Sequence, residues 1–205
     1  MTKERQLMQA ARLLSVLTTP LYLPIVALTI LMVFSYLRML PWGYKFVVLF
    51  VTYIFTLLLP SMLIRLYQYY HGWTPIQLSQ RERRMVPYVI SILCYIAGYY
   101  VMQSMHIPRF MAVILVAALM IQMVCAIVNH YHKVSMHTAA MGGLTGGLVA
   151  FSVIFSFNPV WWLCLALVLS GFVGSSRMVL RQHSLHQVLI GYGIGCVLGF
   201  VMILF

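Results

Sequence analysis

Apolar residues dominate this chain in seven long runs, separated by short polar or turn-rich segments. Most runs are close to the ~20 residues that an α-helix needs to cross ~30 Å of hydrocarbon. We therefore expect one membrane-spanning helix for each run, at residues 13–37, 44–67, 88–105, 109–130, 138–157, 160–175 and 187–205. Six spans stay open as an alternative, because Pro20 and Pro24 interrupt the first run and the sixth is short unless it continues through Arg177.

The pattern predicts an all-α fold, a polytopic transmembrane helix bundle that forms one integral-membrane domain over residues 1–205. Composition agrees, since 63% of the 205 residues are hydrophobic and only 7% are charged. Residues 1–12 carry three basic groups and lead into the first run without a small-residue cleavage site. We expect this basic N-terminal segment to be an anchor rather than a removable signal peptide.

Glycines recur at a spacing that allows close packing of helices in two of the runs. One group lies near the start of the fifth run and the other lies four residues apart in the last run. The two groups are Gly142, Gly143, Gly146 and Gly147, and Gly191, Gly195 and Gly199. Such small-xxx-small faces predict that both helices approach their neighbours closely.

Charge narrows the possible chemistry. The net charge is +11, the two acidic residues are Glu4 and Glu82, and the chain contains no aspartate. Paired-carboxylate hydrolysis, Asp-rich Mg²⁺ sites and carboxylate proton relays are therefore excluded. A basic excess in a membrane protein serves topology, anionic headgroups or an anionic substrate, and nucleic acid is a poor partner because no soluble basic domain exists.

The basic residues lie mostly on one face of the predicted bundle. With seven spans, that face carries ten Lys and Arg residues against three on the other, which makes it cytoplasmic by the positive-inside rule. Six of the ten are also candidates for substrate binding, and without them the tally is four against three. The orientation of the bundle therefore stays open.

Three polar clusters share this face, and each precedes a span: residues 81–87, 129–137 and 176–187. Together they offer guanidinium groups, an ammonium group, a serine hydroxyl and histidines, with hardly an acid among them. Such a site favours an anion, because the arginine fork matches phosphate oxygens bidentately. Two histidines there can do more than bind, since one can attack phosphorus and the other can protonate the leaving oxygen. The alternative is that the arginines reach lipid headgroups and the histidines lie in the membrane interface.

The third cluster carries a specific resemblance. Ser176-Arg177 followed by His183 resembles the S-R-x5-H-x3-D signature of the type 2 phosphatidic acid phosphatase superfamily of lipid phosphate phosphatases. Ser135-Met136-His137 resembles the second signature, P-S-G-H, and the arginine cluster that ends at Pro87 resembles the first, K-x6-R-P, only loosely. The resemblance spans roughly residues 75–200, which we take as the phosphatase-like core.

The resemblance implies a phosphohistidine mechanism that needs neither metal nor cofactor. It makes His183 the nucleophile and His137 the general acid. It also implies that Arg177, Ser135 and a backbone amide hold the phosphoryl oxygens, and each preorganised donor would contribute on the order of 3 kcal/mol.

Four positions depart from the family pattern. Ser79 and Val86 stand where the first signature has lysine and arginine, and we expect Lys133 and one of Arg81 or Arg84, with Arg84 favoured, to take their place. Met136 replaces a glycine. Gln187 replaces the aspartate that orients the nucleophile, and it lies one helical turn after His183, where its carbonyl oxygen can accept the Nδ1 proton.

We therefore expect a membrane-embedded phosphatase that hydrolyses a lipid phosphate or pyrophosphate, in the bacterial inner (cytoplasmic) membrane. The alternative function is a lipid-phosphate binding protein or transporter that keeps the anion site without the reaction, because an amide cannot stabilise an imidazolium as a carboxylate does. The expected partners are the lipid phosphate substrate and membrane lipid.

Overall fold

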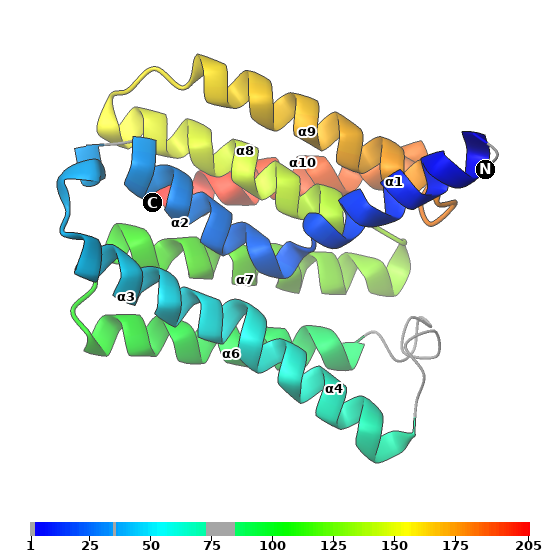
Figure 1. Cartoon of the computed structure of the whole chain (residues 1–205), viewed down its shortest axis with the longest axis horizontal. Helices are drawn as coiled ribbons and strands as arrows, with labels where there is room; N and C mark the ends of the chain where they lie inside the picture. Colours follow the sequence, from blue (N-terminus) through cyan, green and yellow to red (C-terminus); the bar gives the residue numbers. More distant parts are fainter. Residues whose placement is uncertain (1–2, 35, 73–84) are drawn as a thin grey trace.

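In the computed structural model the chain is a bundle of long helices that lie roughly side by side (Figure 1). The structure describes residues 3–34, 36–72 and 85–205. Within them, seven helices are long and apolar enough to cross a membrane, over Arg5–Val33, Trp42–His71, Val86–Ser104, Arg109–Tyr131, Met136–Phe155, Val160–Val179 and Leu185–Leu204. The all-α fold class and the preferred count of seven spans are thus confirmed.

The first span differs from the prediction, because helix begins well before residue 13. Helix α1 covers Lys3–Leu17 and is followed by the short 3₁₀ helix η1 (Pro20–Tyr22) and by α2 (Leu23–Phe34). Residues 3–12 are mostly good helix formers such as Glu, Arg, Gln, Leu, Met and Ala, so the polar segment extends the helix. The chain bends at Thr19, whose ψ of 134° is extended, as expected of a residue that precedes proline.

The second span is one continuous helical path with a local defect. A 3₁₀ turn, η2 (Tyr36–Met39), leads to α3 (Trp42–Tyr53), and a π-helical segment, η3 (Ile54–Leu58), joins α3 to α4 (Leu59–His71). Pro60 lies in the first turn of α4 and has no amide proton to donate to the preceding turn. The wider π turn accommodates this missing donor within the span.

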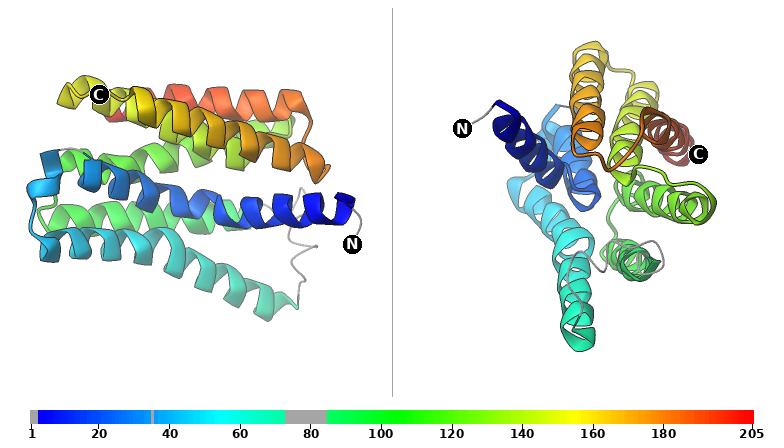
Figure 2. Two further views of the ribbon diagram at one scale, coloured as in Figure 1. Left: turned by 45° about the horizontal axis from the view of Figure 1, so that its top comes forward. Right: turned by 90° about the vertical axis from the view of Figure 1, so that its right-hand side faces the viewer.

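The remaining spans are single helices: α6 (Met85–Ser104), α7 (Arg109–Tyr131), α8 (Met136–Phe155), α9 (Val160–Val179) and α10 (Leu185–Leu204). The sixth span thus continues through Arg177. Viewed along the bundle, α7, α8 and α10 pack together, whereas α3, α4 and α6 lie to the other side (Figure 2). A buried cluster that includes Leu28, Val48, Met102 and Leu115 joins the two groups.

Helices α8 and α10 pack more closely than any other pair, and glycines make this possible. A side-chain carbon added at Gly146 would meet the carbonyl oxygen of Cys196, and one added at Gly195 would meet that of Ala139. The hydroxyl of Tyr192 also donates a hydrogen bond to Thr145 Oγ1 across this interface, at 3.2 Å. The close approach predicted from the glycine spacing is confirmed. In lipid, such backbone-to-backbone packing replaces the hydrophobic effect as the force between helices.

Candidate functional site

The second and third polar clusters, residues 129–137 and 176–187, lie at the same end of the bundle. This end also holds the start of α1 (Figure 1). Residues 73–84 lie outside the described residues, so Arg81 and Arg84, predicted to bind phosphate, lie outside them too. Lys133 is described and lies exposed in the turn between α7 and α8.

The second cluster forms the tight turn that starts α8. Asn129 at the end of α7 accepts a hydrogen bond from the backbone N–H of Val134 at 2.8 Å, which closes the turn. Ser135 is fully buried and is the N-cap residue of α8, with its Oγ accepting from the amide of Thr138 at 3.5 Å. His137 follows in the first turn of α8. Local capping chemistry therefore fixes where Ser135 and His137 lie.

The third cluster forms the turn between α9 and α10. The amides of Gln182 and His183 both donate to the carbonyl oxygen of Arg177, at 3.1 and 3.3 Å. Arg181 has a φ of 51°, so the chain reverses through the left-handed region directly after the helix. This turn places Arg177 on the last turn of α9 and His183 just before α10, and both side chains are half-buried.

His183 is held by Gln187, which stands where the signature that this turn resembles has aspartate. Its Nδ1 lies 3.2 Å from Gln187 Oε1, and the same oxygen accepts a hydrogen bond from the backbone N–H of Ser184 at 3.2 Å. Ser184 and Gln187 form a capping box at the start of α10. Because an amide oxygen only accepts, this contact requires the proton on Nδ1 and gives the lone pair to Nε2.

A backbone contact joins the two turns. The N–H of Ser135 donates to the carbonyl oxygen of Gln187 at 3.3 Å. Gly191, one turn further along α10, allows this approach, because a side-chain carbon there would lie 2.6 Å from the carbonyl oxygen of Ser135 and 2.8 Å from Thr138 Oγ1. The same glycine spacing that packs α8 against α10 therefore holds the second and third clusters together.

A residue that the motifs do not include connects His137 with Arg177. Ser15 of α1 is buried, and its hydroxyl oxygen accepts a hydrogen bond from Arg177 Nη1 at 2.5 Å. Its carbonyl oxygen lies 3.2 Å from His137 Nε2. Since a carbonyl only accepts, this contact requires the proton on Nε2 of His137. His137 also lies within electrostatic range of both Arg177 and His183.

The motifs do not point to Ser15, because α1 is remote from them along the chain. A local signal was nevertheless present. Ala11 and Ser15 are small residues four positions apart, and both are buried, whereas Leu13, Val16 and Leu17 are exposed. Small residues at this spacing mark the face of a helix that approaches a neighbour closely, and α1 packs with this face toward α9.

Fold and site together define a class: an integral membrane protein with seven candidate spans and a histidine and arginine site at one end of its bundle. Comparison with known proteins supports the resemblance. The model of the PAP2 superfamily matches residues 127–205, and members of that superfamily are generally phosphatases. The resemblance drawn from the second and third signatures is thereby confirmed. The match begins after the loosely similar arginine cluster, and no curated protein and no solved structure matches the chain.

Proposed function

We propose that this protein is a phosphatase that hydrolyses a lipid phosphate or pyrophosphate through a phosphohistidine intermediate. The observation that carries the proposal is the pairing of His183 Nδ1 with Gln187 Oε1, which leaves the Nε2 lone pair to attack phosphorus. Helical spans suit the bacterial inner membrane that we propose as its location. The end of the bundle is also where the phosphate headgroup of a membrane lipid would lie.

In the first step, His183 Nε2 forms a bond to phosphorus while the bond from phosphorus to the leaving oxygen breaks. His137, doubly protonated as an imidazolium, gives its Nε2 proton to that oxygen, which departs as an alcohol or as a phosphate, and His137 becomes neutral. In the second step, water attacks the phosphohistidine and His137 takes up the proton from the water. Phosphate then leaves with both histidines restored, so that proton and electron counts balance.

The charge that develops on the phosphoryl oxygens needs fixed donors. Arg177 shares Ser15 as a partner with His137, and its carbonyl oxygen accepts from the amide of His183. We assign it the phosphate clamp, together with the Ser135 hydroxyl and the first amides of α8. Lys133 is exposed nearby and adds a cation. Arg81 and Arg84 remain part of the proposal as further phosphate ligands. Each preorganised donor is worth on the order of 3 kcal/mol in the transition state.

The test is release of phosphate by the purified protein in detergent, from a panel of lipid phosphates and pyrophosphates. His183→Ala should abolish release, whereas His186→Ala should retain it, because His186 is an exposed histidine three positions further on. A ³²P-labelled substrate should leave acid-labile label on the wild-type protein and none on His183→Ala. Phosphate release that survives His183→Ala would sink this mechanism.

Gln187 favours one alternative function for this protein. An amide orients His183 but does not stabilise an imidazolium, so the site can also serve a lipid-phosphate binding protein or transporter. Tight binding of a lipid phosphate by the wild-type protein, with no turnover across the panel, would support this function instead.

A further inference from the structure

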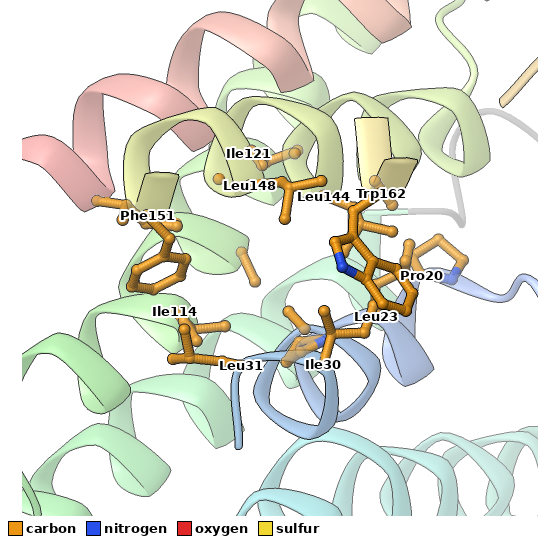
Figure 3. Close-up of a pocket in the computed structure, with 18 of the residues that line it drawn as sticks. Pro20, Leu23, Ile30, Leu31, Ile114, Ile121, Leu144, Leu148, Phe151 and Trp162 are labelled. Carbon is orange, nitrogen blue, oxygen red and sulfur yellow. The ribbon is translucent and has the colours of Figure 1, made fainter. Parts of the chain in front are cut away.

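A partly open cavity runs between α2, α7 and α8 (Figure 3). Along α8 it is lined at intervals of three and four residues, among others by Met136, Ala140, Leu144, Leu148 and Phe151. This spacing keeps the lining on a single face of the helix. The cavity therefore follows α8 along the bundle instead of crossing it.

The walls of this cavity are apolar. Leu23, Ile30 and Leu31 of α2 face Leu144 and Leu148 of α8 across it (Figure 3). Among the described residues that line it, Gln122 is the one with a polar amide side chain. Such walls offer nothing to a charged or strongly hydrated ligand, whereas a hydrocarbon chain needs no hydrogen bond from them.

One end of the cavity meets the residues that we assign to phosphate chemistry. Met136 lines it and directly precedes His137. Pro20 lines it from the first span, five positions after Ser15, which contacts both His137 and Arg177. The other end lies at Phe151, 15 positions along α8 from Met136. At ~1.5 Å per residue this is ~22 Å, most of the ~30 Å hydrocarbon core.

We propose that this cavity binds one hydrocarbon chain of the lipid whose phosphate reacts at His183. The proposal rests on the proposed function and adds a specificity site to it. In a bilayer the chain already lies in an apolar solvent, so its burial in the cavity gains little free energy. The cavity instead positions the substrate. A hydrocarbon chain that lies along α8 fixes the depth and direction of the phosphate beside His137 and Arg177.

If the cavity binds a hydrocarbon chain, Met136 contacts the part of that chain nearest to the phosphate. It stands where the signature that it resembles has glycine, and its side chain lines the end of the cavity nearest to the site. An unbranched thioether adapts its shape to a flexible chain. The first span, α1 with α2, then contributes at both ends of the substrate: Ser15 contacts the residues assigned to the phosphate, and α2 forms a wall for the chain. Both helices lie outside residues 127–205.

The kinetic test compares hexadecyl phosphate with butyl phosphate, which share a headgroup and differ only in chain length. Leu144→Trp fills the middle of the cavity, so the ratio of kcat/KM for hexadecyl to that for butyl phosphate should fall by ~10-fold or more. Leu165→Trp is the matched control. Leu165 lies on α9, outside the cavity lining and half exposed, so the same substitution there should leave this ratio unchanged.

Leu148→Trp provides a second obstruction if Leu144→Trp does not fold. A kcat/KM ratio that stays at the wild-type value in a folded cavity variant would overturn the proposal that the cavity binds a hydrocarbon chain. Hydrolysis of butyl phosphate by the same variant would still support the phosphatase function. If the wild-type protein hydrolyses neither substrate, the proposed function fails for these substrates. The binding measurement described next then tests whether the cavity holds a hydrocarbon chain.

The binding measurement uses His183→Ala and a hexadecyl phosphate that carries a photoreactive diazirine at the far end of its chain. Covalent label should map to the deep end of the cavity, near Leu31, Ile114 and Phe151, and excess hexadecyl phosphate should compete it away. Label confined to exposed residues of the outer surface, such as Leu165 and Leu167, would overturn the proposal.

Discussion

Gln187 Oε1 lies 3.2 Å from Nδ1 of His183 and accepts the amide proton of Ser184 at the same distance. One side chain therefore caps α10 and orients the histidine that precedes this helix. Because the capping box fixes Gln187, the orientation of His183 depends on the local stability of the helix start.

Replacement of Gln187 by alanine removes both contacts. We expect kcat to fall by roughly 100-fold, because His183 loses the partner that fixes its tautomer and direction. Thermal unfolding in detergent should show a smaller change, about 1 kcal/mol, from the lost cap. A variant that keeps the wild-type kcat would show that Gln187 serves only the helix.

Replacement of Gln187 by glutamate tests the missing negative charge. Glutamate has the same length, so it can keep both contacts while it stabilises the imidazolium form of His183. Since the reverse change from acid to amide costs a serine-protease triad ~10⁴ in rate, we expect kcat to rise by at least ~10-fold. Single-turnover measurements of phosphorylation separate this effect from product release, and an unchanged or lower phosphorylation rate would contradict it.

Ser15→Ala removes the hydroxyl that accepts from Arg177 but keeps the carbonyl oxygen near His137. We expect KM for the lipid phosphate to rise by about 10-fold, with weaker inhibition by inorganic phosphate, because a hydrogen bond to a charged group is lost. Ser15→Thr retains a hydroxyl and should restore both values. Thr18→Ala is the control on the same stretch, since the Thr18 hydroxyl bonds only the carbonyl of Leu14 among the contacts seen. An equal effect of Ser15→Ala and Thr18→Ala would indicate a general disturbance of α1.

Gly195→Ala tests the close packing of α8 against α10. The added carbon meets the carbonyl oxygen of Ala139 and would lie 2.8 Å from the amide nitrogen of Gly143, both of them backbone atoms that cannot rotate away. We expect a loss of about 1–3 kcal/mol in the free energy of unfolding, measured by denaturation in detergent. Gly193→Ala is the matched control two positions away, because nothing lies within 4 Å of a side-chain carbon there. Equal stability of the two variants would contradict this packing.

We could predict from the sequence alone the number of spans, the close packing of α8 against α10, and the two turns that carry His137, Arg177, His183 and Gln187. These features depend on hydrophobic length, on glycine spacing and on capping residues within a few positions of each other. They are therefore visible in local sequence patterns. The contact between His183 and Gln187 belongs to this group, because four residues span one helical turn.

The role of the first span became apparent from the packed helices and not from the sequence. Two features follow from how the first span crosses its neighbours: the link from Ser15 to Arg177 across 162 positions, and the cavity between α2, α7 and α8. In lipid, an apolar helix face does not by itself specify its partner, since the bilayer is equally apolar. Shape and a few polar contacts decide the packing instead, and these become visible only when the helices are assembled.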